Sequence, residues 1–513
     1  MRWAASQIAT ALGVAAPPGL AAGTELVGVS IDSRTVERDE LFVAIHGPRH
    51  DGHDHLAAAF ERGAVAAIVA RERFVDLAEA IRRRVFVVDD TLAALHQLAA
   101  RACEIWRTAK PGRRIGAVAG SVGKTTTKEI LAALVGARFR VLKTQGNLNN
   151  EYGLPLTLLQ VEEDHEAIVL EMGMSHRGEL ARLTKIARPD VGVITRVAVE
   201  HLEFFESIEE IALAERELIE NLPWPNATAV LNADDERVVR FDEVSRGPVI
   251  WFGTEAKQHA VGDADFAAAA GESGVRREFR AENIEERGVD GCAFDLLSPA
   301  GRARLELPLV GRHNVMNAVA ALAAASMWGI EAADVKKVFP TLVPADKRGE
   351  VVRFAEGFTV INDTYNSSPT ALTALAELLA TTPGYSRRIL AAGEMRELGA
   401  SSPGLHRECG TTVAALKSID WIIGVTGDAG EFVRAAVEAG HDKSRAKYFD
   451  DSTEAAKFLA EFVRPGDLLL LKGSRGVRME RILEAIDSAH ARMAATVPVT
   501  AMTPAGAQPK GSC

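Results

Sequence analysis

Apolar residues along the chain gather in short runs that alternate with segments of helical spacing. A compact apolar run at 115–119 predicts a strand, and a glycine-rich turn and a helical pattern over 124–135 follow it. Further apolar, largely β-branched runs at 167–170 and 191–195, with a helical pattern over 208–222, continue the alternation. Such alternation predicts an α/β fold, in which a parallel sheet is covered by helices on both faces.

The same alternation returns near residue 340, with strands predicted at 358–361, 389–392, 421–425 and 468–471. Between these two regions, the Ala-, Gly- and charge-rich start of 255–310 predicts a mobile segment. Alternating residues near 292–296 then predict an antiparallel hairpin, and 314–327 predict an Ala-rich buried helix. The basic stretch at 110–114 and the region near 340 are the expected linkers and hinges.

Length and composition fit this organisation. At roughly 150 residues per domain, 513 residues suggest three domains, which we place at 1–110, 111–338 and 339–493. The tail at 494–513 is rich in Ala, Thr, Pro and Gly without periodicity, so we expect it to be disordered. The chain is 47% hydrophobic and 25% charged, which is typical of a globular protein.

Charge and cysteine usage exclude several function classes. The formal net charge of −11 argues against general nucleic-acid binding. The four cysteines lie far apart, which supports neither a disulfide framework nor a zinc ribbon and favours a reducing cytoplasm. No run approaches the about 18 apolar residues that a membrane span needs, so we expect no membrane insertion.

The most specific chemical feature follows the strand at 115–119 and opens the next helix. Glycines let backbone N–H groups turn around phosphate oxygens, and the helix N-terminus adds positive partial charge. Lys124 can reach the β- and γ-phosphates, and the Thr125 hydroxyl can bind Mg²⁺. The loop consists of Gly120, Ser121, Val122, Gly123, Lys124, Thr125 and Thr126.

The general phosphate-loop pattern GxxxxGK[ST] has glycine where this chain has Val118. An ordinary helix start with a buried lysine is the competing interpretation, but it does not explain two glycines. The strand before the loop and the helix after it favour nucleotide binding.

The shortened loop GxxGKT[TS] resembles that of the Mur ligase family, and further segments extend the resemblance over most of the chain. In the N-terminal region these are Asp32-Ser33-Arg34, 39–44 and Asp51-Gly52-His53. In the central region they are Lys128-Glu129, 146–150, 153–159, 170–173 and Gly311-Arg312-His313-Asn314. In the last region they are 362–366, 393–399 and Lys472-Gly473-Ser474-Arg475.

The resemblance is to the members that attach D-alanyl-D-alanine to UDP-N-acetylmuramoyl-tripeptide. It implies a uridine-nucleotide-binding N-terminal α/β domain, a central P-loop ATPase-like parallel sheet and a C-terminal Rossmann-like α/β domain. It also implies a monomeric, cytoplasmic ATP-dependent ligase of peptidoglycan synthesis that uses Mg²⁺. In the implied reaction, ATP converts a peptide carboxylate to an acyl phosphate, which the dipeptide amine then attacks.

The resemblance also implies roles for single residues. The implied catalytic residues are Lys124, Glu171, His201 and Glu215, and the implied metal ligands are Thr125, Glu171, His201 and Glu215. ATP would contact the loop together with Asn314, Asn317, Arg348 and Asp363. The other substrates would contact Ser33, Arg34, Asn149, Tyr365, Asn366, Lys472, Ser474 and Arg475.

Two departures from the family pattern bear on catalysis. Arg196-Val197-Ala198 stands where the family usually has Asn-x-Gly before the histidine. Many Mur ligases carry a carbamylated lysine about fourteen residues after that histidine, and Glu215 occupies the position here. Our hypothesis is that Glu215 supplies the carboxylate for Mg²⁺ directly; the alternative is an ordinary carboxylate on a helix face.

Three other functions compete with this one. A sister Mur ligase that adds another amino acid is disfavoured by Asp363-Thr364-Tyr365-Asn366, since sisters usually have a histidine there. A non-catalytic nucleotide-binding relative would explain the altered 196–200 segment but not the retention of Lys124 and Glu171. A P-loop kinase of small molecules would need neither the uridine-type domain nor the Lys472-Gly473-Ser474-Arg475 segment.

Overall fold

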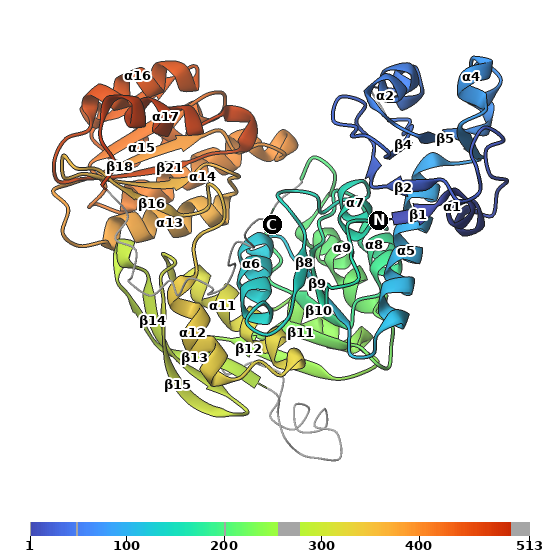
Figure 1. Ribbon diagram of the computed structural model, residues 1–513. Coiled ribbons are helices and arrows are strands. Elements are labelled where there is room, and N and C mark those ends of the chain that lie inside the picture. Colours follow the sequence, from blue (N-terminus) through green and yellow to red (C-terminus); the bar gives the residue numbers. More distant parts are fainter. Residues whose placement is uncertain (1, 48–49, 200–201, 255–277, 494–513) are drawn as a thin grey trace, which may run out of the picture.

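The computed structural model describes residues 2–47, 50–199, 202–254 and 278–493. Three larger sheets form within these ranges, one in each part of the chain, and Figure 1 shows the first and third parts on opposite sides of the central one. The predicted α/β fold with three domains is therefore confirmed. Much of the predicted mobile segment (255–277) and the predicted disordered tail (494–513) lie outside the described residues.

The N-terminal part holds a four-stranded parallel sheet in the order β3-β4-β5-β6, beside an antiparallel pair β1-β2. Its strands are β1 (Arg2–Ala4), β2 (Glu25–Val27), β3 (Val29–Ser30), β4 (Leu41–Val43), β5 (Ala66–Ala70) and β6 (Val85–Val88). Its helices are α1 (Ala5–Leu12), α2 (Leu56–Arg62), α3 (Arg71–Phe74), α4 (Glu79–Arg82) and α5 (Thr91–Ala109).

The central part is built on a nine-stranded sheet in the order β15-β14-β13-β12-β11-β10-β7-β9-β8. The strands from β8 to β13 in this order pair in parallel, and the hairpin β14-β15 adds an antiparallel edge, as the alternation near 292–296 predicted. The strands are β7 (Arg114–Ala119), β8 (Val141–Lys143), β9 (Ala167–Glu171), β10 (Val191–Ile194), β11 (Thr228–Asn232), β12 (Val249–Gly253), β13 (Glu278–Glu286), β14 (Cys292–Ser298) and β15 (Gly301–Leu307).

Helices cover both faces of this sheet, and strand β7 shows why. Ile115, Ala117 and Ala119 contribute to the core on one face, whereas Val118 contributes to the core on the other. A strand whose successive side chains are all apolar is buried on both faces. The first core includes α5 and α7 (Gly153–Leu158), α8 (Glu179–Ala187) and α9 (Ile208–Glu220); the second includes α6 (Lys124–Val135), α11 (Arg312–Ala325) and α12 (Ala332–Val338).

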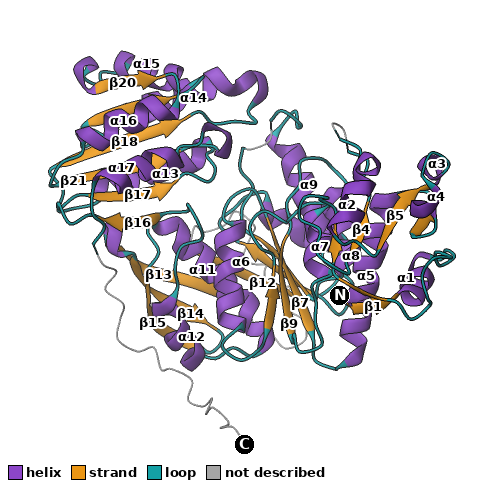
Figure 2. Ribbon diagram, turned by 45° about the horizontal axis from the view of Figure 1, so that its top comes forward, coloured by secondary structure: helices purple, strands orange, loops and turns teal. Residues whose placement is uncertain are grey.

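The third part holds a six-stranded sheet in the order β16-β17-β21-β18-β19-β20, parallel except for β16. Figure 2 shows this sheet between two layers of helices. The strands are β16 (Glu350–Arg353), β17 (Thr359–Asp363), β18 (Arg387–Gly393), β19 (Trp421–Val425), β20 (Ala446–Phe449) and β21 (Asp467–Lys472). The helices are α13 (Pro369–Thr381), α14 (Ser402–Ala415), α15 (Ala429–Glu438), α16 (Ser452–Phe462) and α17 (Glu480–Ala489).

Helix α5, which precedes the expected linker and hinge at 110–114, is anchored to the central part. Helix α5 packs against α7 and α8 there, and Trp106 Nε1 donates a hydrogen bond to the His165 carbonyl at 2.9 Å. Arg107 forms a 2.7 Å ion pair with Asp190. The helix before residue 110 therefore belongs to the central core as much as to the N-terminal one, and the hinge at 110 stays a prediction. The domain boundaries themselves stay predictions.

None of the helices in the described ranges is long and apolar enough to cross a membrane.

Candidate active site

The phosphate loop lies where the sequence places it, between the end of β7 and the start of α6. Gly120 and Gly123 have φ angles of +121° and +96°, which L side chains rarely adopt. A Cβ on Gly120 would lie 2.2 Å from Thr195 Oγ1, and one on Gly123 would lie 2.2 Å from Asn317 Oδ1. Both glycines are therefore required by the backbone conformation and by the close approach of neighbouring elements.

Polar groups of the loop suit a phosphate ligand. Lys124 Nζ folds back and donates to the carbonyls of Gly120 at 2.5 Å and Ser121 at 3.0 Å, so a positive charge sits at the loop. Ser121 Oγ is buried and has no hydrogen-bond partner among the described residues. A buried hydroxyl without a partner is costly, and a phosphate oxygen would satisfy it.

Glu171 ends strand β9 beside the loop, in register with Val118 of β7. Its side chain is buried, and Oε1 accepts a hydrogen bond from Asn149 Nδ2 at 2.8 Å. The other oxygen, Oε2, is also buried, and the described part of the chain offers it no hydrogen-bond partner. A buried carboxylate oxygen with spare lone pairs beside a phosphate loop fits a Mg²⁺ ligand.

Glu215 reaches the loop from helix α9. It is 2% exposed, and its Oε2 accepts a hydrogen bond from the Gly120 N–H at 2.8 Å. Its neighbour Glu217 serves another purpose, since its carboxylate accepts from the N–H groups of Gly178 and Ala181 at the start of α8. Of the two buried acids on α9, Glu215 therefore belongs to the phosphate loop, while Glu217 caps a helix.

Residues after β10 also contact the loop, and sequence analysis treated Arg196, Val197 and Ala198 among them only as a departure from the family pattern. Ser121 N–H donates to the Arg196 carbonyl at 2.7 Å, and Thr195 Oγ1 donates to the Val122 carbonyl at 2.8 Å. Asp235 accepts from the Val197 N–H at 2.9 Å.

Sequence analysis missed Thr195 and Asp235. Both follow strand ends at the carboxyl edge of the central sheet, which is the available signal, since parallel sheets place functional groups there.

The two asparagines expected to contact ATP are buried. Asn314 donates from Nδ2 to the Val310 carbonyl at 2.8 Å, and Asn317 Nδ2 donates to Asn314 Oδ1 at 3.0 Å. Asn317 also approaches Thr127 Oγ1 at 3.4 Å, which links α11 to α6. In this structure the pair therefore fixes the phosphate-loop helix to its neighbour.

In the third part, the predicted residues Asp363 and Lys472 pair at the ends of neighbouring strands β17 and β21. Lys472 Nζ is 2.7 Å from Asp363 Oδ1 and 2.5 Å from the Asn366 carbonyl. His313, on the first turn of α11, lies within electrostatic range of both side chains. Burial lowers the pKa of His313, although the charge of Asp363 acts in the opposite direction. The carboxyl edge of the sheet in the third part therefore lies beside the start of α11.

The remaining predicted residues of the third part lie on nearby loops. The guanidinium of Arg348 stacks over the Tyr365 ring at 4.3 Å from its centroid. Ser474 is buried, and its Oγ accepts from the Arg396 N–H at 3.0 Å, while Arg475 is exposed.

The predicted uridine-site residues lie apart from the loop, in the N-terminal part after β3. Arg34 binds the Asp32 carboxylate through Nε and Nη2 at 2.9 and 2.7 Å, and Ser33 lies between them in sequence. Hydrogen bonds from the Arg34 side chain and backbone lower the pKa of Asp32 to about 2.

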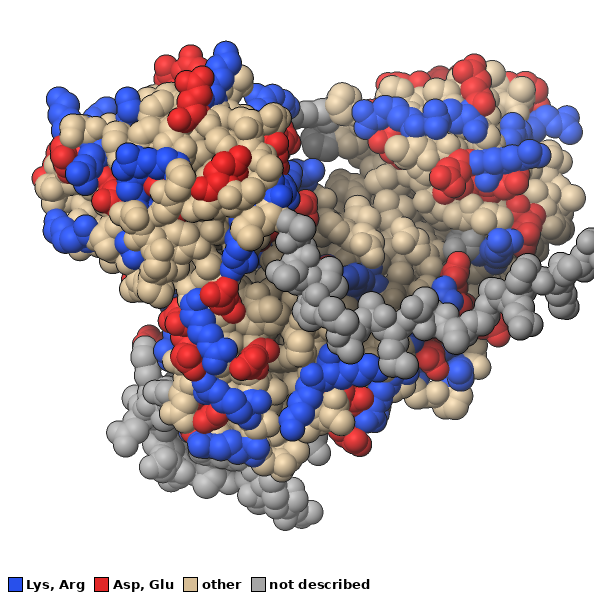
Figure 3. Space-filling view, turned by 60° about the vertical axis from the view of Figure 1, so that its left-hand side comes forward, with Lys and Arg blue, Asp and Glu red and all other residues tan. Residues whose placement is uncertain are grey.

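Figure 3 shows a hollow between the three parts, whose rims carry both basic and acidic side chains.

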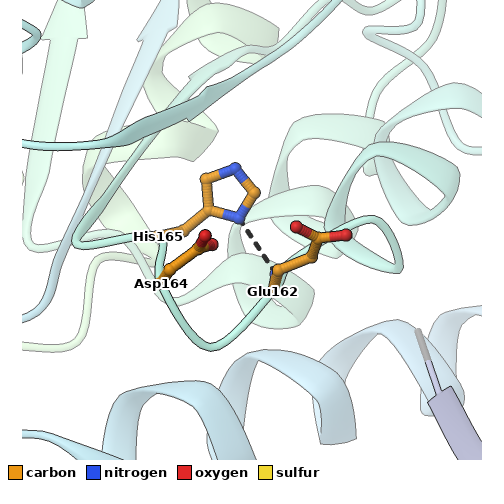
Figure 4. Close-up of side chains that lie close together, drawn as sticks. All are labelled: Glu162, Asp164 and His165. Atoms are coloured by element: carbon orange, nitrogen blue, oxygen red, sulfur yellow. Dashed lines mark hydrogen bonds between the residues drawn. The ribbon is translucent and has the colours of Figure 1, made fainter. Parts of the chain in front are cut away.

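His201, the predicted second metal ligand, lies outside the described residues. A different group, Glu162, Asp164 and His165, has ligand atoms within 4.8 Å of one another. Figure 4 shows the three side chains close together. Arg140 forms ion pairs with both acids, and His165 Nδ1 accepts from the Glu162 N–H at 3.0 Å. A cation is already supplied by the arginine, so we assign no metal to this group.

Three models of one family match successive parts of the chain. They are described as "Mur ligase family, catalytic domain" at residues 25–102, "Mur ligase middle domain" at 118–325 and "Mur ligase, glutamate ligase domain" at 347–475. A UDP-N-acetylmuramoyl-tripeptide--D-alanyl-D-alanine ligase of Bacillus subtilis is 34% identical over 90% of this chain and 93% of its own length. The chain belongs to the Mur ligase family.

Other Mur ligases agree in sequence and structure. The Escherichia coli ligase of the same description is 32% identical over 90% of this chain and 94% of its own. A crystal structure of MurF from Acinetobacter baumannii matches with a TM-score of 0.80 at 29% identity, over 95% of this chain and 99% of that one. A MurF ligase from Thermotoga maritima in complex with ADP matches with a TM-score of 0.72 at 30% identity, over 90% and 97%.

Proposed function

We propose that the chain is an ATP-dependent ligase that joins D-alanyl-D-alanine to the carboxylate of UDP-N-acetylmuramoyl-tripeptide. The product would be the UDP-linked pentapeptide precursor of peptidoglycan. One observation carries the proposal: Ser121 Oγ of the phosphate loop and Oε2 of the adjacent Glu171 are buried and have no partner among the described residues. The chain that holds them aligns along its length with ligases of this description. We further propose a monomeric protein of the cytoplasm.

The chemistry must bring two anions together, the peptide carboxylate and the ATP triphosphate. The carboxylate attacks the γ-phosphorus and ADP leaves, which forms an acyl phosphate; the dipeptide amine then attacks the acyl carbon and phosphate leaves. Lys124 and the loop N–H groups would hold the β- and γ-phosphates in line for the first step. The helix dipole of α6 would add positive potential at the same point.

Magnesium fits this site because Glu171 Oε2 is a buried carboxylate oxygen that no described residue satisfies. The residues that would hold it are Thr125, Glu171, Glu215 and His201. When bound, Mg²⁺ would neutralise charge that builds up on the phosphate oxygens. Glu215 would supply the carboxylate that, by the resemblance, a carbamylated lysine supplies in many Mur ligases.

The remaining substrate contacts are proposed by position. A cavity of about 430 Å³ adjoins the loop at Thr126 and is lined mainly by α6, β8 and residues 341–343 and 345. It is a suitable place for the nucleoside. Arg348, Asp363, Asn314 and Asn317 would act on the ATP side. The uridine end would meet Ser33 and Arg34, and the peptide end would meet Asn149, Tyr365, Asn366, Lys472, Ser474 and Arg475.

The test is phosphate release from ATP by the purified protein with Mg²⁺. UDP-N-acetylmuramoyl-tripeptide alone, D-alanyl-D-alanine alone and both together are compared, with tripeptides ending in lysine and in diaminopimelate. We expect release only when both substrates are present. Release with a free amino acid in place of the dipeptide would instead identify a sister ligase. Binding of ATP without release under any condition would identify a non-catalytic relative.

A further inference from the structure

Arg196 is built into the wall of the phosphate loop by its backbone. It lies two residues after the end of β10, at the carboxyl edge of the central sheet, and its carbonyl accepts from the Ser121 N–H at 2.7 Å. Its amide nitrogen would lie 3.0 Å from a Cβ placed on Gly120. The backbone of Arg196 is therefore fixed directly against the phosphate loop.

The Arg196 side chain is exposed, and no described residue forms a hydrogen bond, ion pair or ring contact with its guanidinium. Some other arginines around the central sheet are engaged, such as Arg107 with Asp190 and Arg182 with Glu151. Lys124, the other cation of the loop, donates to two loop carbonyls. Arg196 thus joins a backbone held against the loop to a positive charge that no described residue neutralises.

The negative charges around the loop require a further cation. Glu171 and Glu215 are buried beside it, and an ATP and a substrate carboxylate would add further negative charge. During phosphoryl transfer, charge spreads over the three equatorial oxygens of the moving group, and a planar guanidinium can donate two parallel hydrogen bonds to such oxygens.

We propose that Arg196 is a further catalytic residue that contacts the γ-phosphoryl group during its transfer and then the acyl phosphate. It acts as a fixed cation and hydrogen-bond donor, stays protonated throughout, and leaves the balance of bonds in the reaction unchanged. The inference rests on the proposed function, since it assigns a role within that reaction.

The experiment compares Arg196→Ala, Arg196→Lys and the control Arg246→Ala. Arg246 is also exposed and without a partner in the described ranges, but it precedes β12 and so lies at the opposite edge of the sheet. For Arg196→Ala we expect kcat to fall roughly 10²- to 10³-fold, the range for loss of one charge-stabilising donor, while KM for ATP changes less than about 3-fold. Arg196→Lys should recover part of kcat, because lysine restores the positive charge but cannot donate two parallel hydrogen bonds.

A second readout does not need turnover. Wild-type protein and Arg196→Ala should bind ADP equally, but only the wild type should bind ADP more tightly when aluminium fluoride is added as a mimic of the planar phosphoryl group. Equal tightening in both proteins, or a kcat for Arg196→Ala within about 3-fold of wild type, would overturn the proposal. If the wild type itself lacks ligase turnover, the proposed function fails, and the ADP–fluoride comparison still decides whether Arg196 contacts the phosphoryl position.

Discussion

At the scale of single residues, the carboxylate of Glu215 is the group on which the metal hypothesis depends. Its Oε2 accepts from the Gly120 N–H, so it fixes the loop and lies where a ligand of the phosphate-bound cation is needed. We expect Glu215→Ala to require more Mg²⁺ and to lose roughly 10²-fold in kcat. We expect Glu215→Lys to recover activity only with added bicarbonate, which would carbamylate the lysine. The measurement is kcat against Mg²⁺ concentration with and without bicarbonate.

Glu217→Ala is the matched control on the same helix. Glu217 caps α8, so its loss should lower the free energy of unfolding by about 1–2 kcal/mol and leave the Mg²⁺ dependence unchanged. Normal Mg²⁺ dependence in Glu215→Ala would show that Glu215 is only a helix-face carboxylate. The same magnesium effect in both variants would point to a general disturbance of α9.

Asp51 gives a prediction about pH and stability. Burial alone would raise the pKa of Asp51, but hydrogen bonds from the backbone and ring of His53 lower it from 3.8 to about 2. A lowered pKa means that the charged form stabilises the fold above pH 3.8, and that this contribution is lost as the pH falls toward 2. Asp51→Asn should therefore cost about 1–2 kcal/mol at pH 7 and progressively less below pH 4.

The measurement is the unfolding midpoint of wild type and Asp51→Asn from pH 7 to pH 2.5. Asp32→Asn is the comparison, because the pKa of Asp32 is also about 2 but its partner Arg34 has a side chain 86% exposed. An exposed pair contributes little, so this variant should stay within about 0.5 kcal/mol of wild type. A cost for Asp51→Asn that does not change with pH would contradict the linkage.

The sequence predicted single residues well where one motif carries them and poorly where the partner is distant. The loop glycines followed from their spacing, and their close neighbours Thr195 and Asn317 then explain why no other residue fits. The hydrogen bond from Gly120 to Glu215 joins residues 95 positions apart. No local pattern encodes such a contact, since it depends on how α9 packs against the sheet.

At the scale of elements, the phosphate loop is held between α6 and α11, and this packing can be tested. A Cβ at Gly123 would collide with Asn317 Oδ1 at 2.2 Å, and the φ of +96° adds strain. We expect Gly123→Ala to weaken ADP binding at least 10²-fold, and Gly123→Ala/Asn317→Ala to recover part of the loss. The remaining loss reflects the strained φ, which costs roughly 1–2 kcal/mol for an L residue.

Calorimetric titration with ADP of the wild type, both single variants and the double variant completes the cycle. Asn317→Ala alone loses its contacts with Thr127 and Asn314, so it should weaken binding only slightly. If the losses of ADP affinity in the two single variants simply add in the double variant, the collision between Asn317 and the loop does not limit ADP binding.

Local patterns predicted those elements whose apolar residues have a clear periodicity. Helix α6 spans Lys124–Val135, and strand β19 spans Trp421–Val425, as the spacing indicated. Helix α5 was assigned to the N-terminal domain, yet it contacts α1 on one side and α7 and α8 on the other. Its apolar positions mark it as buried, but periodicity does not tell which core buries it.

At the scale of the whole molecule, the third part touches the central part at residues 202 and 203. Glu203 N–H donates to the Glu397 carbonyl at 3.3 Å, and a Cβ on Gly399 would lie 3.4 Å from Glu203 Cα and from the Leu202 carbonyl. Leu202 directly follows His201 in the sequence. The loop after β18 therefore sets how closely the third sheet approaches residues 202 and 203.

A bulky residue at this contact should separate the two parts and slow the reaction without changing the phosphate loop. We expect Gly399→Trp to lower kcat about 10- to 100-fold, the effect of misplacing reacting groups by about an ångström, while ADP affinity stays within about 3-fold. Small-angle scattering should show a larger radius of gyration than in the wild type. Gly404→Trp is the control, since a Cβ at Gly404 meets nothing within 4 Å. Wild-type turnover in Gly399→Trp would mean that the approach of the third part to residues 202–203 plays no part in catalysis.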